Sequence, residues 1–487
     1  MFKKLSFEQK QFYLFLIIHF FVWSLIGLIR VVLPTDTLEG IWWGSFMMPG
    51  NPKHPPLAGW LTYLTYTTFK CNISIYLLSQ AFIFGGFIYT YKLAQNFLTK
   101  EQAMLSVVVL EGCWIYSYIT GYYGFNPDVV LLLTIPAIIY YFYKSIYSNR
   151  LIDWILLGLF AGISFMDKLQ TGLIIIAMAI WALIFKRETF KNVFFYIAVV
   201  IAFVCFYPHL SWLIKHDFMP FLYLDSKLQT INFFSHITEP LIFLGYQIAQ
   251  IAGAVIIFLT ARKKLPVLLN KTADEKGCFL LILTLIPLVM HMIIAAVSGC
   301  NVRPQWGYVF WSLIGIILYY YIPTETSKDN FKSVLKGSYT VMLIIFLAFG
   351  TMLTVEKNYR SRYPVASIFG DIKQIWNDNC NTPLKYVGGF HEWTFPLTIY
   401  GDTHPINIMD TYGYKNLWLD EDDLKKSGAF IIGRTSDSVV SFSHSACPYL
   451  AEDIVIEPKP YSFTLTNALR QPRVYTIYYY IVSPLNN

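Results

Sequence analysis

The sequence predicts a polytopic α-helical membrane protein of about eleven spans that ends in a small α/β domain. Of the 487 residues, 55% are hydrophobic and 14% are charged, whereas soluble globular proteins carry about 25% charged residues. Apolar runs of about 20 residues recur as far as residue 354. From residue 355 these runs stop and Asp, Asn, Gly and Pro become more frequent. We therefore expect a transmembrane domain over residues 1–354 and an α/β domain over residues 355–487.

The apolar runs predict the spans individually. We expect them near residues 12–33, 73–91, 103–120, 128–147, 153–167, 169–185, 192–213, 239–261, 278–298, 305–322 and 333–354. Two of them, 153–167 and 169–185, are short and meet at Asp167-Lys168, which predicts a tight turn or a break. Basic residues precede the first run, but no A-x-A-like cleavage site follows it, so we expect an uncleaved first span.

The distribution of Lys and Arg predicts the orientation. One set of alternate loops carries about three times as many of these residues as the other, and the richer set is expected in the cytoplasm. The richer set includes Lys3, Lys4, and the basic residues between Arg262 and Lys276. The loop from Asp36 to His54 then lies outside. An odd number of spans places the C-terminal domain outside as well.

In the C-terminal domain, short β-prone segments alternate with turn residues. Strands are expected at 385–390, 429–433, 453–457 and 474–482, and a helix at 420–426. Cys380 and Cys447 both fall here, and a disulfide between them is one option if the domain is extracytoplasmic. The other five cysteines lie in or beside spans and show no metal-binding spacing.

Ionisable residues recur in the loops that are expected outside. Singly, each has an ordinary explanation: a solvated carboxylate, an acid at a helix N-terminus, a snorkelling lysine, or an arginine at lipid headgroups. Ionisable groups at a membrane boundary cost free energy, and such positions usually mark a site. Acids and bases that gather at one boundary therefore predict a cavity there. They are Asp36, Glu39, Lys53, His54, Asp128, Lys168 and Arg303.

Several of these residues lie in motifs that resemble the bacterial dolichyl-phosphate-mannose-protein mannosyltransferase-like family, which includes the lipid A aminoarabinose transferase. The motifs are Asp36…Glu39 followed by residues 54–60 (HPPLAGW), 126–132 (NPDVVLL), 162–168 (GISFMDK) and 303–308 (RPQWGY). Residues 385–390, 397–400 and 404–405 resemble the strand pattern of the family's C-terminal domains. The resemblance spans nearly the whole chain and implies the membrane-embedded GT-C fold.

The resemblance also implies an activity and roles for the residues. Family members transfer a sugar from a polyprenyl phosphate to an acceptor on the outer side of the membrane. Asp36, then Glu39, is the expected base, and Asp128 is expected to orient the reacting groups. The cations expected at the donor phosphate are Lys53, His54, Lys168 and Arg303. The family often has an adjacent Asp-Glu pair, whereas here Asp36 and Glu39 are three residues apart.

The same resemblance implies partners and a candidate cofactor. No cofactor is certain; a divalent metal lies near this loop in some relatives, and Glu39 and His54 are its candidate ligands here. The expected partners are membrane lipids, the polyprenyl-phosphate donor, and an acceptor that is lipid A, another envelope glycan, a polyprenyl lipid or a protein. The bacterial inner membrane, with a periplasmic site, is the expected location. No P-loop or dinucleotide motif is present, and the net charge of +7 forms no basic stripe for nucleic acid.

Other functions remain open. A transporter or flippase of lipid-linked sugars would place its charges near the bilayer midplane, often in repeated halves. The sequence shows no repeat, and its charges gather at one boundary. A ligase or polymerase of surface polysaccharide would use similar donors, so the sequence separates it poorly from a transferase. A non-catalytic scaffold explains the spans but leaves the clustered charges unexplained.

Overall fold

The computed structural model describes residues 5–260, 274–322, 324, 326–356, 362–409, 416–447, 449–450 and 454–485. It contains two compact units. Unit 1 comprises residues 1–27, 49–58 and 73–349; unit 2 comprises residues 28–48, 59–72 and 350–487. Some basic residues used to predict the orientation lie outside the described residues, namely Lys3, Lys4, Arg262, Lys263, Lys264 and Lys271.

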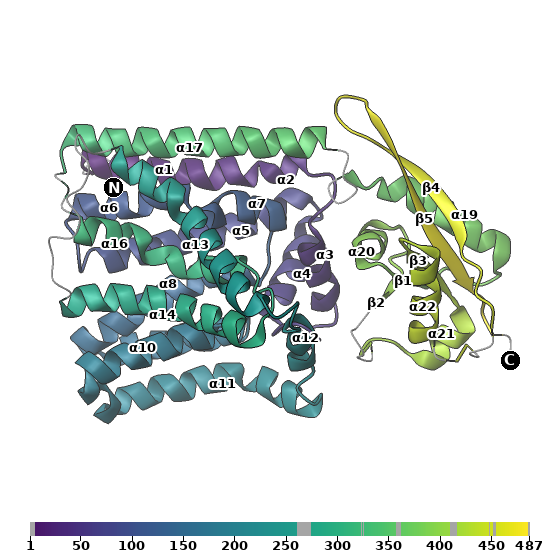
Figure 1. Ribbon diagram of the computed structural model, residues 1–487, viewed down its shortest axis with the longest axis horizontal. Coiled ribbons are helices and arrows are strands. Elements are labelled where there is room, and N and C mark those ends of the chain that lie inside the picture. The colour runs from purple at the N-terminus through teal and green to yellow at the C-terminus, as the bar shows by residue number, and fades with distance from the viewer. Residues whose placement is uncertain are drawn as a thin grey trace. The chain divides into compact units, whose positions relative to one another are not determined.

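Long apolar helices build unit 1. Seven helical segments in the described residues are long and apolar enough to cross a membrane: Phe7–Ile29, which holds α1 (Phe7–Ser24) and α2 (Ile26–Ile29), then α5 (Asn72–Ala94), α8 (Pro127–Ser148), α11 (Val193–Lys215), α13 (Ser235–Leu259), α14 (Glu275–Ser298) and α17 (Lys328–Val355). Within the unit, α1, α10, α11, α14 and α17 run roughly parallel (Figure 1).

The other four predicted spans coincide with short or broken helices. Helices α9 (Leu151–Phe165) and α10 (Thr171–Phe185) are the short pair, and a turn joins them. The two broken spans are α6 (Lys100–Val108) with η2 (Val109–Gly112), η3 (Trp114–Tyr116) and α7 (Tyr118–Tyr123), and α15 (Gln305–Tyr308) with η5 (Val309–Leu313) and α16 (Ile314–Tyr321). Two further elements are η4 (Arg187–Lys191) and α12 (Met219–Lys227). The predicted polytopic helical fold is confirmed.

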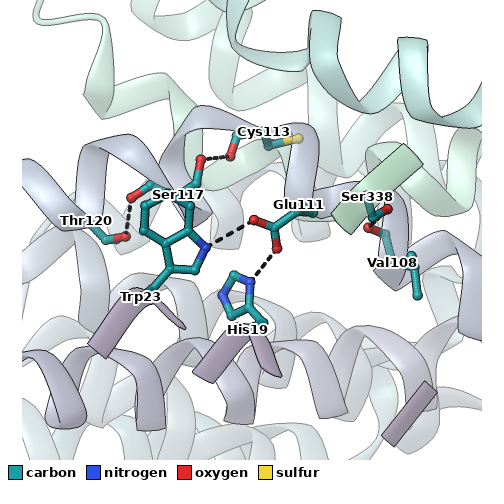
Figure 2. A network of polar contacts seen from close by, with 8 residues as sticks. All are labelled: His19, Trp23, Val108, Glu111, Cys113, Ser117, Thr120 and Ser338. Atoms are coloured by element: carbon teal, nitrogen blue, oxygen red, sulfur yellow. Dashed lines mark hydrogen bonds and ion pairs between the residues drawn. The ribbon is translucent and has the colours of Figure 1, made fainter. Parts of the chain in front are cut away.

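Polar side chains support the break between α6 and α7. Apolar surroundings offer no water to backbone groups that a broken helix leaves free, so side chains must replace it. Ser338 Oγ donates to the carbonyl of Val108 at 3.0 Å, and Gln250 Oε1 accepts from the backbone N–H of Ile115 at 3.1 Å. Figure 2 shows the Ser338 contact at the end of α6.

A buried carboxylate at the same break makes polar contacts with α1. Glu111, in η2, is fully buried; one of its oxygens accepts from Trp23 Nε1 at 3.0 Å, and the other lies 2.5 Å from His19 Nδ1. Both partners project from α1 toward Glu111 (Figure 2). A carboxylate and an imidazole are costly among apolar helices unless they are paired. The sequence prediction did not single out Glu111 or His19, although each interrupts an apolar run.

We expect Glu111→Leu to lower the thermal stability of the protein strongly. The substitution leaves Trp23 Nε1 and His19 Nδ1 buried without their acceptor, at a cost of about 1–3 kcal/mol for each group. Glu111→Gln, which keeps an acceptor oxygen, should lower the unfolding temperature less. Thermal unfolding in detergent measures this, with exposed Glu188→Gln as the control. Equal unfolding temperatures for Glu111→Leu and wild type would show that the network stabilises nothing.

In unit 2, one prediction from the sequence is wrong. The stretch beginning at Pro34-Thr35-Asp36 was expected to be a loop, but residues 35–44 form helix α3 (Thr35–Gly44), and α4 (Leu57–Phe69) follows. The helices pack very closely, since a Cβ atom added to Gly44 would lie 2.1 Å from the Gly59 carbonyl oxygen. These helices are too short to register as spans, and their polar residues resemble those of loops.

A five-stranded mixed sheet forms the rest of unit 2. Its strands are β1 (Tyr386–Gly389), β2 (Ile406–Met409), β3 (Ala429–Gly433), β4 (Lys459–Thr466) and β5 (Pro472–Val482), in the order β2-β1-β3-β5-β4. The first three strands of this order are parallel, and β5 is antiparallel to both β3 and β4. The helices are α19 (Val365–Asn379), α20 (His391–Tyr400), α21 (Glu421–Ser427) and α22 (Ser436–Ala446). The predicted α/β character is confirmed.

Several details of this domain differ from the prediction. Residues 397–400 belong to α20 and not to a strand, and residues 454–457 form no strand, while residue 453 lies outside the described residues. Cys380 and Cys447 are both buried free thiols, so they form no disulfide. Cys447 packs instead in the core, with Ile431 and Val439. The predicted boundary at residues 354–355 stays a prediction.

Candidate functional site

The turn between α9 and α10 is the centre of a polar cluster in unit 1. Its Lys168 forms an ion pair with Asp128, at the start of α8. The side chains are 12% and 9% exposed, so solvent screens the pair little. The Lys168 Nζ also lies 6.0 Å from the centre of the Trp306 ring, within cation–π range. Two of the predicted site residues, 40 positions apart in the chain, are therefore in direct contact.

The residues before Asp128 explain its position in the first turn of α8. Asn126 caps α8, because its side-chain oxygen accepts from the backbone N–H of Val129 at 3.3 Å. Pro127 takes the first helical position, where its missing N–H costs nothing. Asp128 then falls in the first turn, where the helix dipole favours a carboxylate. Asp128 therefore lies between the N-terminus of α8 and Lys168.

A turn built by Asn51 presents Lys53 and His54. The buried side chain of Asn51 accepts from the backbone N–H groups of Lys53 and His54 at 2.9 and 2.8 Å. The Lys53 Nζ lies 5.4 Å from the centre of the Tyr223 ring, and the His54 ring meets the same tyrosine edge-on at 6.4 Å. Tyr223 belongs to α12, so this aromatic ring defines one wall beside the two residues.

The charge state of His54 follows from its neighbours. Burial, together with the positive charges of Lys168 and Lys53, lowers the pKa of His54 to about 3. The imidazole is therefore neutral at pH 7 in the protein without substrate. A neutral imidazole offers one hydrogen-bond donor and one acceptor, so Lys53 and Lys168 supply the positive charge here.

The segment from Arg303 to Trp306 is tied to this cluster by amide side chains. Gln170, two residues after Lys168, donates to the carbonyl of Trp306, and Gln247 on α13 donates to the carbonyl of Pro304 at 2.9 Å. Arg303 itself is exposed. The structure thus places the backbone of the predicted Arg303 motif beside the turn that carries Lys168, and leaves the guanidinium accessible to solvent. Neither Gln170 nor Gln247 was predicted, because a lone glutamine gives no sequence signal.

An apolar cavity of about 700 Å³ reaches the α9–α10 turn. Phe165 and Leu169, on either side of the turn, line it, and it extends along α9, α10 and α11. Its lining also includes Phe221 and Leu224 from α12, and Thr189 and Phe190 at the other end of α11. The cavity therefore follows the length of α11, with the charged cluster beside the α9–α10 turn.

Asp36 and Glu39 lie in unit 2, on helix α3. Their spacing of three residues places them on one face of the helix. Asp36 is exposed in the first turn, whereas Glu39 is buried, with 6% of its surface accessible. The two carboxylates that the sequence left as alternatives for the base therefore differ in their exposure to solvent.

The side chains present offer little to a divalent metal. No three His, Cys, Asp or Glu residues within the described ranges come together as a metal site. The two suggested ligands, Glu39 and His54, belong to different units. Metal sites in proteins ordinarily draw on three or more such ligands.

Comparisons with known proteins show which family and which solved structures this chain resembles. Residues 53–212 match the family described as dolichyl-phosphate-mannose-protein mannosyltransferase. The ArnT of Cupriavidus metallidurans, solved with undecaprenyl phosphate, has the same fold: the TM-score is 0.67 at 12% identity, covering 96% of this chain and 97% of that one. Its apo structure gives 0.66 at 12% identity, covering 98% of both chains. No curated protein sequence matches. The predicted family resemblance and the GT-C fold are confirmed.

Proposed function

We propose that this chain, whose residues 53–212 match the dolichyl-phosphate-mannose-protein mannosyltransferase family and whose fold is that of ArnT, transfers a sugar from undecaprenyl phosphate to a cell-envelope acceptor. The acceptor is lipid A, another envelope glycan or a protein. The reaction takes place at the periplasmic face of the bacterial inner membrane, which the Lys and Arg distribution favours. The C-terminal α/β domain lies on that same side.

One observation carries the proposal: the turn that bears the buried Lys168–Asp128 ion pair also contributes side chains to the lining of an apolar cavity of about 700 Å³. Lys168 bears the charge, and its neighbours Phe165 and Leu169 line the cavity. A polyprenyl phosphate has this same division, with an anionic head on a long apolar tail. Burying the tail supplies about 25 cal/mol for each Å² removed from water, while the cations select the phosphate.

The reaction needs a base for the acceptor and stabilisation for the departing phosphate. We assign the base to Asp36, which is exposed, with Glu39 as the second choice. As the bond from the sugar to the phosphate breaks, the phosphodiester becomes a monoester and gains negative charge. Lys168, Lys53 and Arg303 are assigned to that charge, and neutral His54 to a hydrogen bond with a phosphate oxygen. Asp128 holds Lys168 in place.

A flippase of lipid-linked sugars is the principal alternative. Transporters often place ionisable groups on broken helices, and Glu111 lies on one. Glu111 is, however, fully buried and bonded to His19 and Trp23 of α1, as a structural tie would be. The two functions also differ chemically, because a flippase leaves its lipid-linked sugar intact.

Narrowing the apolar cavity should weaken use of the donor. Ala179, on α10, lines the cavity and is half-buried, so Ala179→Trp should fill part of it. We expect the KM for an undecaprenyl-phosphate-linked sugar to rise about tenfold, which corresponds to about 1.4 kcal/mol, with a smaller change in kcat. Steady-state transfer assays in detergent measure both constants.

The matched control lies on the same helix. Ile176 is 42% exposed and lies outside the cavity lining, so Ile176→Trp adds the same bulk elsewhere on α10. It should leave the KM for the donor near that of wild type. If both variants, or neither, changed this KM, the cavity would not be the site of the polyprenyl tail.

A further inference from the structure

Asp167, the residue before Lys168, is a buried acid that the proposed mechanism does not use. Its side chain is 0% exposed. Neither of its carboxyl oxygens makes a hydrogen bond of ordinary geometry within the described residues. Asp128 is the second acid beside this turn, and it is already bonded to Lys168. One lysine therefore stands next to two acids and pairs with only one of them.

An ionised Asp167 would be a buried charge without a partner, which is among the most costly arrangements in a protein. Burial raises the pKa of Asp167 well above its ordinary value; the Asp128 carboxylate adds to the rise, and Lys168 and the Ala58 amide only partly oppose it. An uncharged carboxyl avoids the cost of a buried charge. With an uncharged Asp167, the Asp128 carboxylate and the two lysines Lys168 and Lys53 leave an excess of positive charge, which an ionised Asp167 would cancel.

Asp167 also touches the segment that presents Lys53 and His54. The backbone N–H of Ala58 faces the Asp167 carboxyl. One residue earlier in each segment, the N–H of Leu57 donates to the carbonyl of Met166 at 3.0 Å. One backbone hydrogen bond, with the Asp167 carboxyl facing Ala58 beside it, thus joins the α9–α10 turn to the residues that directly follow His54-Pro55-Pro56. The same turn holds Asp128 through Lys168, so it connects both halves of the cationic cluster.

We propose that Asp167 is a positioning residue that acts in its uncharged form: it anchors the Lys53–Ala58 segment against the Asp128–Lys168 pair without adding negative charge where a phosphate binds. The inference rests on the proposed function for the identity of the ligand. The anchoring needs an acceptor at position 167, which the carbonyl oxygen of a neutral carboxyl provides. The phosphate needs the positive potential that a carboxylate would remove.

Three variants test this role. Asp167→Asn keeps the shape and the acceptor and is always uncharged, whereas Asp167→Ala removes the group that faces Ala58. Ser164→Ala is the control, because Ser164 is buried in the last turn of α9 and bonds Thr134 and Thr171. Binding of undecaprenyl phosphate to the purified proteins in detergent at pH 7.5 gives the Kd. Infrared spectroscopy of wild type and Asp167→Asn reports whether the carboxyl of Asp167 is protonated.

Asp167→Asn should bind undecaprenyl phosphate within about twofold of wild type, and Asp167→Ala about tenfold more weakly, with Ser164→Ala unchanged. Wild type should show the infrared band of a protonated carboxylic acid that Asp167→Asn lacks. If Asp167→Asn bound as weakly as Asp167→Ala, or if that band were missing from wild type, the uncharged role would be wrong. A folded Asp167→Ala that bound like wild type would contradict the anchoring.

A failure of the proposed function would look different. In that case wild type itself would not bind undecaprenyl phosphate, while the infrared comparison would still decide whether Asp167 is uncharged. An Asp167→Ala protein that did not fold would leave the comparison of wild type with Asp167→Asn, in binding and in the infrared spectrum, as the test.

Discussion

Asp36→Asn is expected to reduce kcat for sugar transfer by about 10²- to 10⁴-fold, which is the usual contribution of a general base. The side chain keeps its size but loses its negative charge and its ability to accept a proton. Because Asp36 is exposed on α3, the substitution should leave the unfolding temperature near that of wild type. The KM for the donor should change little, since the base acts on the acceptor. Steady-state kinetics with thermal unfolding on the same preparations tests this.

Glu39→Gln is the matched comparison, three residues along the same helix. Glu39 is buried, so its loss should affect stability more than kcat. The opposite pattern, with full activity in Asp36→Asn and none in a stable Glu39→Gln, would assign the base to Glu39. Full activity in both variants would show that neither carboxylate of α3 takes part in the reaction.

Lys168→Met should lose transfer by about 10²- to 10³-fold, comparable to the loss of a donor that stabilises a developing charge. Lys168 lies in the turn whose neighbouring residues Phe165 and Leu169 line the apolar cavity, and nothing in methionine replaces its charge. The same change leaves Asp128 buried without its partner, and breaking a buried ion pair in this way costs about 3–5 kcal/mol. Both activity and unfolding temperature should therefore fall, as kinetics and thermal unfolding measure.

A double variant separates the two effects. Asp128→Asn combined with Lys168→Met leaves no buried charge, so it should recover much of the stability lost in Lys168→Met. It should stay inactive, because the phosphate still lacks its cation. If stability and activity returned together, Lys168 would serve the fold alone.

A second ion pair provides the control. Lys144, near the other end of α8, pairs with Asp153 of α9 at 3.0 Å. Lys144→Met breaks a pair joining the same two regions of the chain, far along α8 from Asp128. Its effect should be confined to the unfolding temperature. Loss of donor binding in Lys144→Met would mean that any loosening of α8 against α9 disables the protein.

The membrane architecture was predictable because span length and apolar composition are local properties. All eleven predicted spans coincide with helices, including the short pair that meets at Asp167-Lys168. Elements shorter than a span were harder to predict. Helix α3 was taken for a loop because ten residues that include Asp36 and Glu39 carry no long apolar pattern. In unit 2, strand β2 has only four residues, which is too short for a clear alternating pattern.

The candidate site was predictable in its residue types and only partly in its geometry. The sequence indicated Asp128 and Lys168 but not their contact, which depends on how α8 meets the α9–α10 turn. It counted His54 as a cation, whereas burial beside two lysines makes it neutral without substrate. Such effects depend on tertiary packing, which residue spacing does not reveal.

The central claim is that the protein consumes a polyprenyl-phosphate-linked sugar. Purified protein would be incubated with undecaprenyl-phosphate-linked hexoses and pentoses and an extract of envelope lipids and glycans, and mass spectrometry would follow donor, products and free undecaprenyl phosphate. We predict that wild type releases undecaprenyl phosphate in step with a glycosylated product, and that Asp36→Asn and Lys168→Met do not. An intact donor with every sugar tested, accompanied by its movement across liposome membranes, would contradict the claim and establish a flippase.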